Sequence, residues 1–202
     1  MSNLTDKIVL ITGVGKGSGR TLAQAFAERG AVVAANDISP INVEQVVDEI
    51  NSKGLRAKAY IEDVAKKVGV QNLINQVEDD FGRIDILINH AAVEPKVSVL
   101  DMDEWDWHRV LDVNLTGTFL MTQSAGRLMR EQGGGVIINL ISTNQDPATH
   151  EAAFIASMKG LEAFTDQAAR ELSLHGIHVY AVENTADTIV ERVFSILDAA
   201  EA

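Results

Sequence analysis

The sequence has no cysteine among its 202 residues, which excludes disulfides, a thiolate nucleophile and cysteine-ligated metals. It also has few basic residues: 17 Lys and Arg stand against 29 Asp and Glu, and the net charge is −12. A nucleic-acid binder needs basic groups to neutralise phosphates, and anionic membranes attract the same positive charge. The composition therefore speaks against a nucleic-acid partner and against docking on a membrane.

Long hydrophobic runs are also missing, and no stretch approaches the roughly 20 apolar residues of a membrane span. The N-terminal MSNLTDKIVLITG has a short apolar run that leads straight into a glycine loop, unlike a signal peptide. We therefore expect a cytoplasmic protein. Asp, Glu and His do not gather at metal-ligand spacing, so we predict no metal.

Apolar runs of strand length alternate with longer amphipathic stretches along the whole chain. The expected strands are 7–12, 31–37, 56–63, 84–90, 135–142 and 177–182, and the expected helices are 18–30, about 41–53, about 65–80, a stretch within 103–131, about 150–174, and 188–200. Continuously apolar strands are typical of a sheet covered on both faces, and strand–helix alternation predicts parallel strands with right-handed crossovers. We expect an α/β fold, a Rossmann-like doubly wound parallel sheet of about six strands. We expect it to form a single dinucleotide-binding domain over residues 1–202.

The glycine-rich stretch ITGVGKGSGR (11–20) lies between the first strand and the first helix. Gly13, Gly17 and Gly19 allow a tight turn, and the helix that begins near Ser18 directs its free N–H groups at a pyrophosphate. Asp37 follows at the end of the second strand, close to the spacing of a carboxylate that binds the adenosine ribose. The pattern predicts a dinucleotide site.

Two charged residues of this site favour different cofactors. Asp37 would repel the extra phosphate of NADP, whereas Lys16 could contact that phosphate or be a solvated loop lysine. Because like charges in contact cost several kcal/mol, Asp37 favours NAD over NADP.

Further motifs extend the pattern along the chain: TGVGKGSG (12–19), Asp63 with Val64 after the third strand, NHAA (89–92) with Asn89, DVNLTGTF (112–119) with Asn114, and IINLIS (137–142) with Ser142. Together they resemble the short-chain dehydrogenase/reductase family from about residue 5 to about 182. The resemblance implies an NAD-dependent oxidoreductase that acts on a small-molecule alcohol or carbonyl substrate.

The resemblance also implies roles for individual residues. The catalytic ones are Asn114, Ser142 and Lys159, and those that bind the cofactor are Gly13, Lys16, Gly17, Ser18, Gly19, Asp37, Asp63, Val64, Asn89 and Lys159. The family's tyrosine, which exchanges a proton with the substrate, normally lies thirteen residues after the serine and four before the lysine. Both spacings arrive at Ile155, which carries no proton. Because proton-transfer catalysis contributes roughly 10²–10⁴-fold, we expect impaired turnover.

The C-terminal part departs from the family in two ways. YAVENTADT (180–188) has no Pro-Gly pair, and the substrate-covering loop and seventh strand do not follow, so we expect a shortened C-terminus. The sixth strand would then be a sheet edge, which requires cover or pairing. We therefore expect a homo-oligomer.

Other residues that could replace the tyrosine are few. The two tyrosines are expected elsewhere: Tyr60 near the adenine side and Tyr180 in the core. His150 could line the substrate pocket and titrates in the right range, or it could simply precede the next helix on the surface. His90 is expected to be a polar residue at a strand end.

The remaining candidates are expected to have structural roles. Glu94 and Glu151 are expected to be solvated, and Trp105 and Trp107 are expected to be packing or interface residues. A Ser142–His150 hydrolase lacks the nucleophile-elbow sequence around the serine.

Three hypotheses remain open from the sequence. The chain is an NAD-dependent oxidoreductase with an impaired relay, a catalytically inactive NAD(H)-binding sensor, scaffold or oligomer subunit, or a degenerate fold that binds little. Position 155 separates the first two.

Overall fold

A computed structural model describes residues 4–142, 151–185 and 187–200, and it has at its centre a six-stranded sheet in the order β3-β2-β1-β4-β5-β6. All five strand pairs are parallel. The strands are β1 (Ile8–Thr12), β2 (Val32–Asp37), β3 (Arg56–Ile61), β4 (Ile86–Asn89), β5 (Gly135–Ile141) and β6 (Ile177–Glu183). The predicted doubly wound fold is therefore confirmed.

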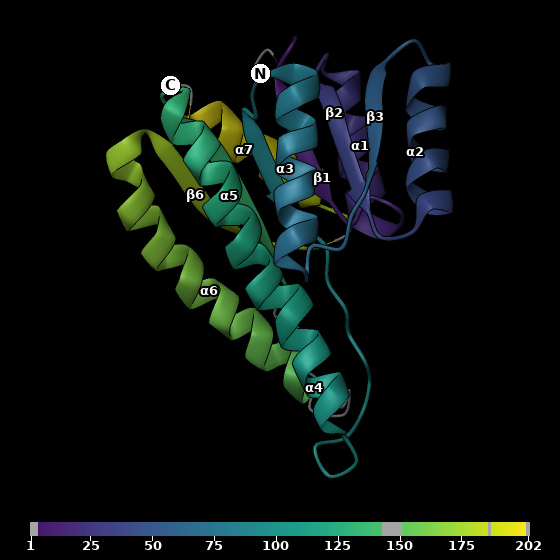
Figure 1. The fold of residues 1–202 in the computed structure, drawn as a ribbon, viewed down its shortest axis with the longest axis vertical. Helices are drawn as coiled ribbons and strands as arrows, with labels where there is room; N and C mark the ends of the chain where they lie inside the picture. Colours follow the sequence, from purple (N-terminus) through teal and green to yellow (C-terminus); the bar gives the residue numbers. More distant parts are fainter. Residues whose placement is uncertain (1–3, 143–150, 186, 201–202) are drawn as a thin grey trace.

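Helices cover both faces of this sheet (Figure 1). One layer is α3 (Lys67–Phe81), α5 (Thr118–Glu131) and α6 (Ala152–Leu172), and the other is α1 (Gly17–Glu28), α2 (Pro40–Ser52) and α7 (Ile189–Ala200). A separate hydrophobic core fills each side of the sheet, for example with Phe26 and Phe194 on one side and Leu73 and Met121 on the other. None of the helices in the described ranges is both long and apolar enough to cross a membrane.

The central and edge strands differ in burial. All residues of β1 and β4 are buried, as continuous apolar runs predict. The edge strand β3 is different, because Tyr60 is its only fully buried residue. At the other edge, β6 alternates between buried and exposed positions along part of its length. The prediction that both faces of the sheet are covered therefore holds for its central strands, because the helices lie over them.

The long helix expected within 103–131 consists of three parts. α4 (Glu104–Leu111) leads into a π-helical segment, Asp112–Gly117, and then into α5. α4 and the loop before it project beyond one end of the sheet (Figure 1). Asp103 caps α4 by accepting a hydrogen bond from the Asp106 N–H at 2.7 Å. The π-helical segment contains Asn114, and such segments often occur at functional sites.

Candidate active site

The glycine turn after β1 brings backbone closer than side chains allow. Gly13 has φ +72°, and a Cβ added there would lie 2.8 Å from the Ala91 Cα. A Cβ on Gly19 would lie 2.4 Å from the Gly13 carbonyl oxygen. α1 begins at Gly17 and no side chain caps its first N–H groups. The turn therefore leaves donors at a helix N-terminus available to an anionic group.

The Asp37 carboxylate is positioned against this turn. Oδ2 accepts a hydrogen bond from the Gly15 N–H at 2.8 Å, and Oδ1 accepts one from the Ser39 N–H at 2.9 Å. These bonds orient the carboxylate, and each oxygen keeps a second lone pair for a ligand hydroxyl. Lys16 is exposed at the outer side of the turn.

The turns after β3 and β4 complete this end of the sheet. Asp63 Oδ1 accepts a hydrogen bond from the Ala65 N–H at 3.0 Å. Val64, the residue between these two in the chain, is buried. Asn89 is buried and donates to Asn139 Oδ1 at 2.8 Å, which connects β4 to β5.

His90 packs beneath the glycine turn. Its Nδ1 lies 2.9 Å from the Gly13 carbonyl oxygen, and its backbone N–H donates to Thr12 Oγ1 at 3.1 Å. Burial lowers the pKa of His90, against the opposing effect of the Gly13 carbonyl. Since a carbonyl only accepts, the neutral ring donates from Nδ1. The expected polar residue at a strand end therefore also supports the turn.

Asn114 forms the centre of a buried hydrogen-bond frame. Its Oδ1 accepts a hydrogen bond from the Val93 N–H at 2.8 Å, and its Nδ2 donates to the Val93 carbonyl at 3.0 Å and to Ser157 Oγ at 3.0 Å. Asn114 is 1% exposed and Ser157 is fully buried. One asparagine thus joins the segment after β4 to α6.

The face of α6 next to Ser142 is apolar. The Ser142 N–H lies 3.4 Å from the Met158 sulfur, and Met158 packs with Phe154 and Ile141 in one buried cluster. Phe154 and Met158 share a helix face because they are four residues apart. Lys159 instead is exposed and pairs with Glu162 on its own helix at 2.8 Å. The structure therefore places Met158, rather than Lys159, against Ser142, with Phe154 in the same apolar cluster and Ile155 packed against it.

Both tyrosines of the sequence lie on edge strands of the sheet, β3 and β6. Tyr60 is buried on β3 and donates to Asp80 Oδ2 at 2.7 Å, and burial raises its pKa. Tyr180 is only half-buried, contrary to the expected core position, and stacks on His178 with ring centroids 6.5 Å apart. His150 lies outside the described residues.

The two glutamates expected to be solvated differ from each other. The Glu151 side chain is 1% exposed, whereas that of Glu94 is 41% exposed. Sequence periodicity could not show this burial, because it depends on a contact between the segment after β4 and the start of α6. Trp105 is 68% and Trp107 38% exposed in the described part of the chain, so the interface role expected as an alternative to packing stays a prediction for them.

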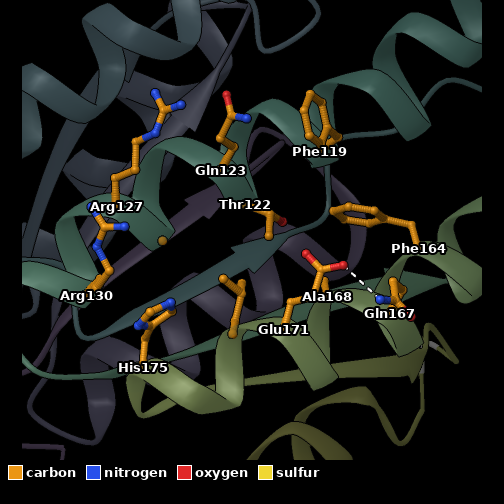
Figure 2. Close-up of a pocket in the computed structure, with 12 residues that line it drawn as sticks. Phe119, Thr122, Gln123, Arg127, Arg130, Phe164, Gln167, Ala168, Glu171 and His175 are labelled. Atoms are coloured by element: carbon orange, nitrogen blue, oxygen red, sulfur yellow. Dashed lines mark hydrogen bonds between the residues drawn. The ribbon is translucent and has the colours of Figure 1, made fainter.

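A separate cavity of about 370 Å³ lies between α5 and α6 (Figure 2). Figure 2 shows Phe119 and Phe164 at one end and Arg127, Arg130 and His175 at the other. None of the predicted site residues lines it. The cavity is therefore distinct from the site around the glycine turn and Ser142.

The residues at the carboxyl ends of β1 and β2 fit a dinucleotide. Uncapped helix N–H groups suit a pyrophosphate, the missing Cβ atoms of Gly13 and Gly19 permit close approach, and Asp37 suits ribose hydroxyls. Ligands of open α/β sheets bind outside the carboxyl ends of the strands, at the point where the strand order reverses, which here lies between β1 and β4. When bound, a nicotinamide dinucleotide supplies or accepts the hydride.

Comparisons with known proteins agree with this geometry. The family model for short chain dehydrogenases matches residues 7–188. The chain is 36% identical to the (2S)-[(R)-hydroxy(phenyl)methyl]succinyl-CoA dehydrogenase subunit BbsD of Thauera aromatica, over 89% of this chain and 72% of that protein. It is 34% identical to an NAD-dependent glycerol dehydrogenase of Listeria innocua, over 91% of this chain and 71% of that protein.

A solved structure is similar over the same extent. A short-chain type dehydrogenase/reductase from Mycobacterium marinum superposes with a TM-score of 0.87 at 33% identity, covering 91% of this chain and 78% of the other. The chain thus belongs to the short-chain dehydrogenase/reductase family, whose members are oxidoreductases that use nicotinamide cofactors on alcohol and carbonyl substrates.

Proposed function

We propose that this protein is an NAD(H)-dependent oxidoreductase of the short-chain type, acting slowly on a small alcohol or carbonyl compound. The observation that carries the proposal is the glycine turn with Asp37 against it. The carboxylate at this place favours NAD because it would repel the 2′-phosphate of NADP. The glycerol dehydrogenase relative is NAD-dependent by name, which supports the same choice.

Each part of the cofactor has a proposed partner. The pyrophosphate lies on Gly13, Lys16, Gly17, Ser18 and Gly19, the adenosine ribose on Asp37, the adenine beside Asp63 and Val64, and the nicotinamide side near Asn89. These residues are at the ends of β1 to β4, in the turns that follow them, or, for Gly17 to Gly19, in the first turn of α1. Asn114 and Ser142 remain as the catalytic polar residues, and the predicted role of Lys159 at the nicotinamide ribose is the alternative to the register proposed below.

Slow turnover follows from the face of α6 that meets Ser142. We propose that Phe154 and Met158 occupy the places of the family's tyrosine and lysine, one residue earlier than the spacing from Ser142 predicts. In either register no tyrosine is present. The missing phenol removes roughly 10²–10⁴-fold of proton-transfer catalysis.

A second candidate is a catalytically inactive NAD(H)-binding protein. Phe154 and Met158 favour it, since they match tyrosine and lysine in shape while lacking the hydroxyl and the charge. Side chains of similar shape that lack the reactive groups suit a protein that binds the cofactor without turning over a substrate. Under both candidates we propose self-association, because β6 is a sheet edge in the described structure. Light scattering of the purified protein measures this.

The test is to restore the relay in the proposed register. Phe154→Tyr with Met158→Lys should raise turnover by roughly 10²–10⁴-fold, measured with glycerol and NAD⁺ and with acetoacetyl-CoA and NADH. Ile155→Tyr is the matched control, because it places a phenol one residue away beside the native Lys159. No turnover in any of these proteins, with NADH still bound, would favour the inactive binding protein. A gain confined to Ile155→Tyr would return the register to positions 155 and 159.

A further inference from the structure

The cavity between α5 and α6 has two ends of opposite character. At one end Phe119 and Phe164 meet edge to face, with ring centroids 6.0 Å apart and an interplanar angle of 82°. At the other end the side chains of Arg127 and Arg130 line the wall (Figure 2). The volume of about 370 Å³ lies within the range of small-molecule sites. The cavity thus combines an aromatic end and a cationic end within the space of a small ligand.

The two arginines of the cationic end have no carboxylate partner. Neither Arg127 nor Arg130 lies within ion-pair distance of a carboxylate in the described part of the chain, whereas Arg83, for example, pairs with one at 2.6 Å. Glu171 also lines the cavity, but its Oε1 accepts a hydrogen bond from Gln167 Nε2 on the same helix at 2.8 Å. Two unpaired guanidinium groups in a chain of net charge −12 are therefore available to an anion from outside.

The position of the arginines on α5 leads to the same conclusion. Arg130 lies in the last turn of the helix, where a cation interacts favourably with the helix dipole. Arg127 lies one turn earlier, so the dipole does not account for it. Residues three apart are neighbours on a helix surface, and like charges at such spacing repel. An anion bound between the two guanidinium groups would offset this repulsion.

The middle of the cavity is lined by small residues, Gly126 and Ala168. A Cβ on Gly126 would meet only Leu172, at 3.8 Å, so the glycine leaves open space inside a helix. Phe119 and Arg127 are eight residues apart on α5, which corresponds to about 12 Å along the helix axis. An extended chain of ten carbons has roughly this length. The space between the two ends therefore suits an alkyl or acyl chain.

We propose that this cavity binds an amphiphilic anion, which is an alkyl or acyl chain with a carboxylate or phosphate head. The chain lies against Phe119 and Phe164, and the head lies between Arg127 and Arg130. Charge complementarity selects this occupant, because a purely apolar ligand would leave the two guanidinium groups unpaired. The binding site goes beyond the proposed oxidoreductase function and does not depend on it.

The first test is calorimetric titration of the purified protein with decanoate and with decyl phosphate. At least one of the two should bind, and the tighter one identifies the head group. Decan-1-ol should bind about tenfold more weakly or less, because it cannot form charge-assisted hydrogen bonds with the arginines. Octanoate should bind about tenfold more weakly than decanoate, because two methylene groups are no longer buried.

Two arginines at helix ends give a matched pair of variants. Arg130→Gln should weaken binding of the anion by about tenfold. Arg170→Gln should leave binding unchanged, since Arg170 lies in the last turn of α6, has no ion pair among the described residues and does not line the cavity. Gly126→Leu should abolish binding, because its side chain fills the middle of the cavity. Circular dichroism checks that each variant is folded.

A second measurement places the ligand without a variant at the cationic end. In NMR spectra of phenylalanine-labelled protein, assigned with Phe119→Leu and Phe164→Leu, the ring signals of Phe119 and Phe164 should shift on addition of decanoate or decyl phosphate. The signal of Phe26, which lies in the core on the other side of the sheet, should stay in place.

Three outcomes would overturn the proposal. The first is that neither anion gives heat with the folded native protein. If light scattering then shows a dimer that Gly126→Leu dissociates, a second copy of the chain covers the cavity instead. The second is an equal loss of affinity in Arg130→Gln and Arg170→Gln, which would place the anion elsewhere. The third is an unchanged affinity in Gly126→Leu. NADH titration of the same variants should give the native Kd, so failure here leaves the oxidoreductase proposal untouched.

Discussion

The two halves of the sheet, one with β1 and β2 and the other with β5, carry sites of different character. Where β1 and β2 end, glycines, uncapped helix N–H groups and the oriented Asp37 lie together as a dinucleotide requires. Where β5 ends, Met158 of α6 lies against Ser142, and Phe154 packs with Met158 and Ile141. Binding and proton transfer depend on different strands of one sheet, so a chain of this fold can keep one and change the other. Sequence similarity to active relatives speaks mainly for the fold and the first of these sites.

The largest effect is expected from a substitution in the glycine turn that weakens cofactor binding. Gly19→Ala places a Cβ 2.4 Å from the Gly13 carbonyl oxygen, so the backbone of the turn must move. Overpacking of this kind costs about 1–3 kcal/mol, and we expect the Kd for NADH to rise about 10–100-fold. Calorimetric titration with NADH measures the change.

Gly126→Ala is the matched control, since it lies in α5 and its Cβ would meet only Leu172 at an ordinary 3.8 Å. It should leave NADH binding unchanged and raise stability by roughly 0.5–1 kcal/mol. Equal NADH affinity of Gly19→Ala and the native protein would mean that the turn does not hold the pyrophosphate.

A smaller effect is expected in the pH dependence of stability, through His90 beneath the glycine turn. Burial lowers the pKa of His90, so the folded protein binds fewer protons there than the unfolded chain. The contribution of His90 to the free energy of unfolding should therefore be constant above about pH 7.5. Below about pH 6.5 the free energy of unfolding should fall by up to about 1.4 kcal/mol per pH unit. His90→Asn should remove this decline, as followed by urea unfolding from pH 5 to pH 8.

The exposed His175 supplies the control for that measurement. His175→Asn should leave the pH profile as it is in the native protein. If His90→Asn and the native protein decline in parallel, His90 is not held neutral beneath the turn.

The smallest expected effect concerns the reaction side. Lys159 pairs with Glu162 on the surface, and exposed ion pairs contribute about 0–1 kcal/mol. Lys159→Met should therefore change stability by less than about 1 kcal/mol and NADH affinity by less than about twofold. A tenfold loss of NADH affinity would instead restore Lys159 to the cofactor site and weaken the register that contains Met158.

Much of the fold could be predicted from the sequence because buried strands and amphipathic helices have clear periods. All six strands and the helices appear near their expected places. The π-helical segment could not be predicted, since it differs from an α-helix in its i→i+5 hydrogen bonds over a short stretch, and the sequence predicted only a helix somewhere within 103–131. The alternating burial of β3 depends on its edge position, which strand periodicity does not reveal.

The candidate site divides in the same way. The glycine turn and Asp37 are local features with fixed spacing, and the sequence predicted their proximity. The residues that face Ser142 depend on how α6 packs on Ile141, so the count from Ser142 that predicts Ile155 and the packing on which we base the proposed register of Phe154 and Met158 use different information. The ion pair of Lys96 with Glu151 joins segments far apart in the chain, and neither residue belongs to a motif.

The most direct test of the central claim, an intact cofactor site beside an altered reaction site, is calorimetric titration of the purified protein with NADH and with NADPH. We predict micromolar binding of NADH and at least about tenfold weaker binding of NADPH, because Asp37 accepts ribose hydroxyls and repels a phosphate. No heat from either cofactor, with a folded protein by circular dichroism, would contradict the claim.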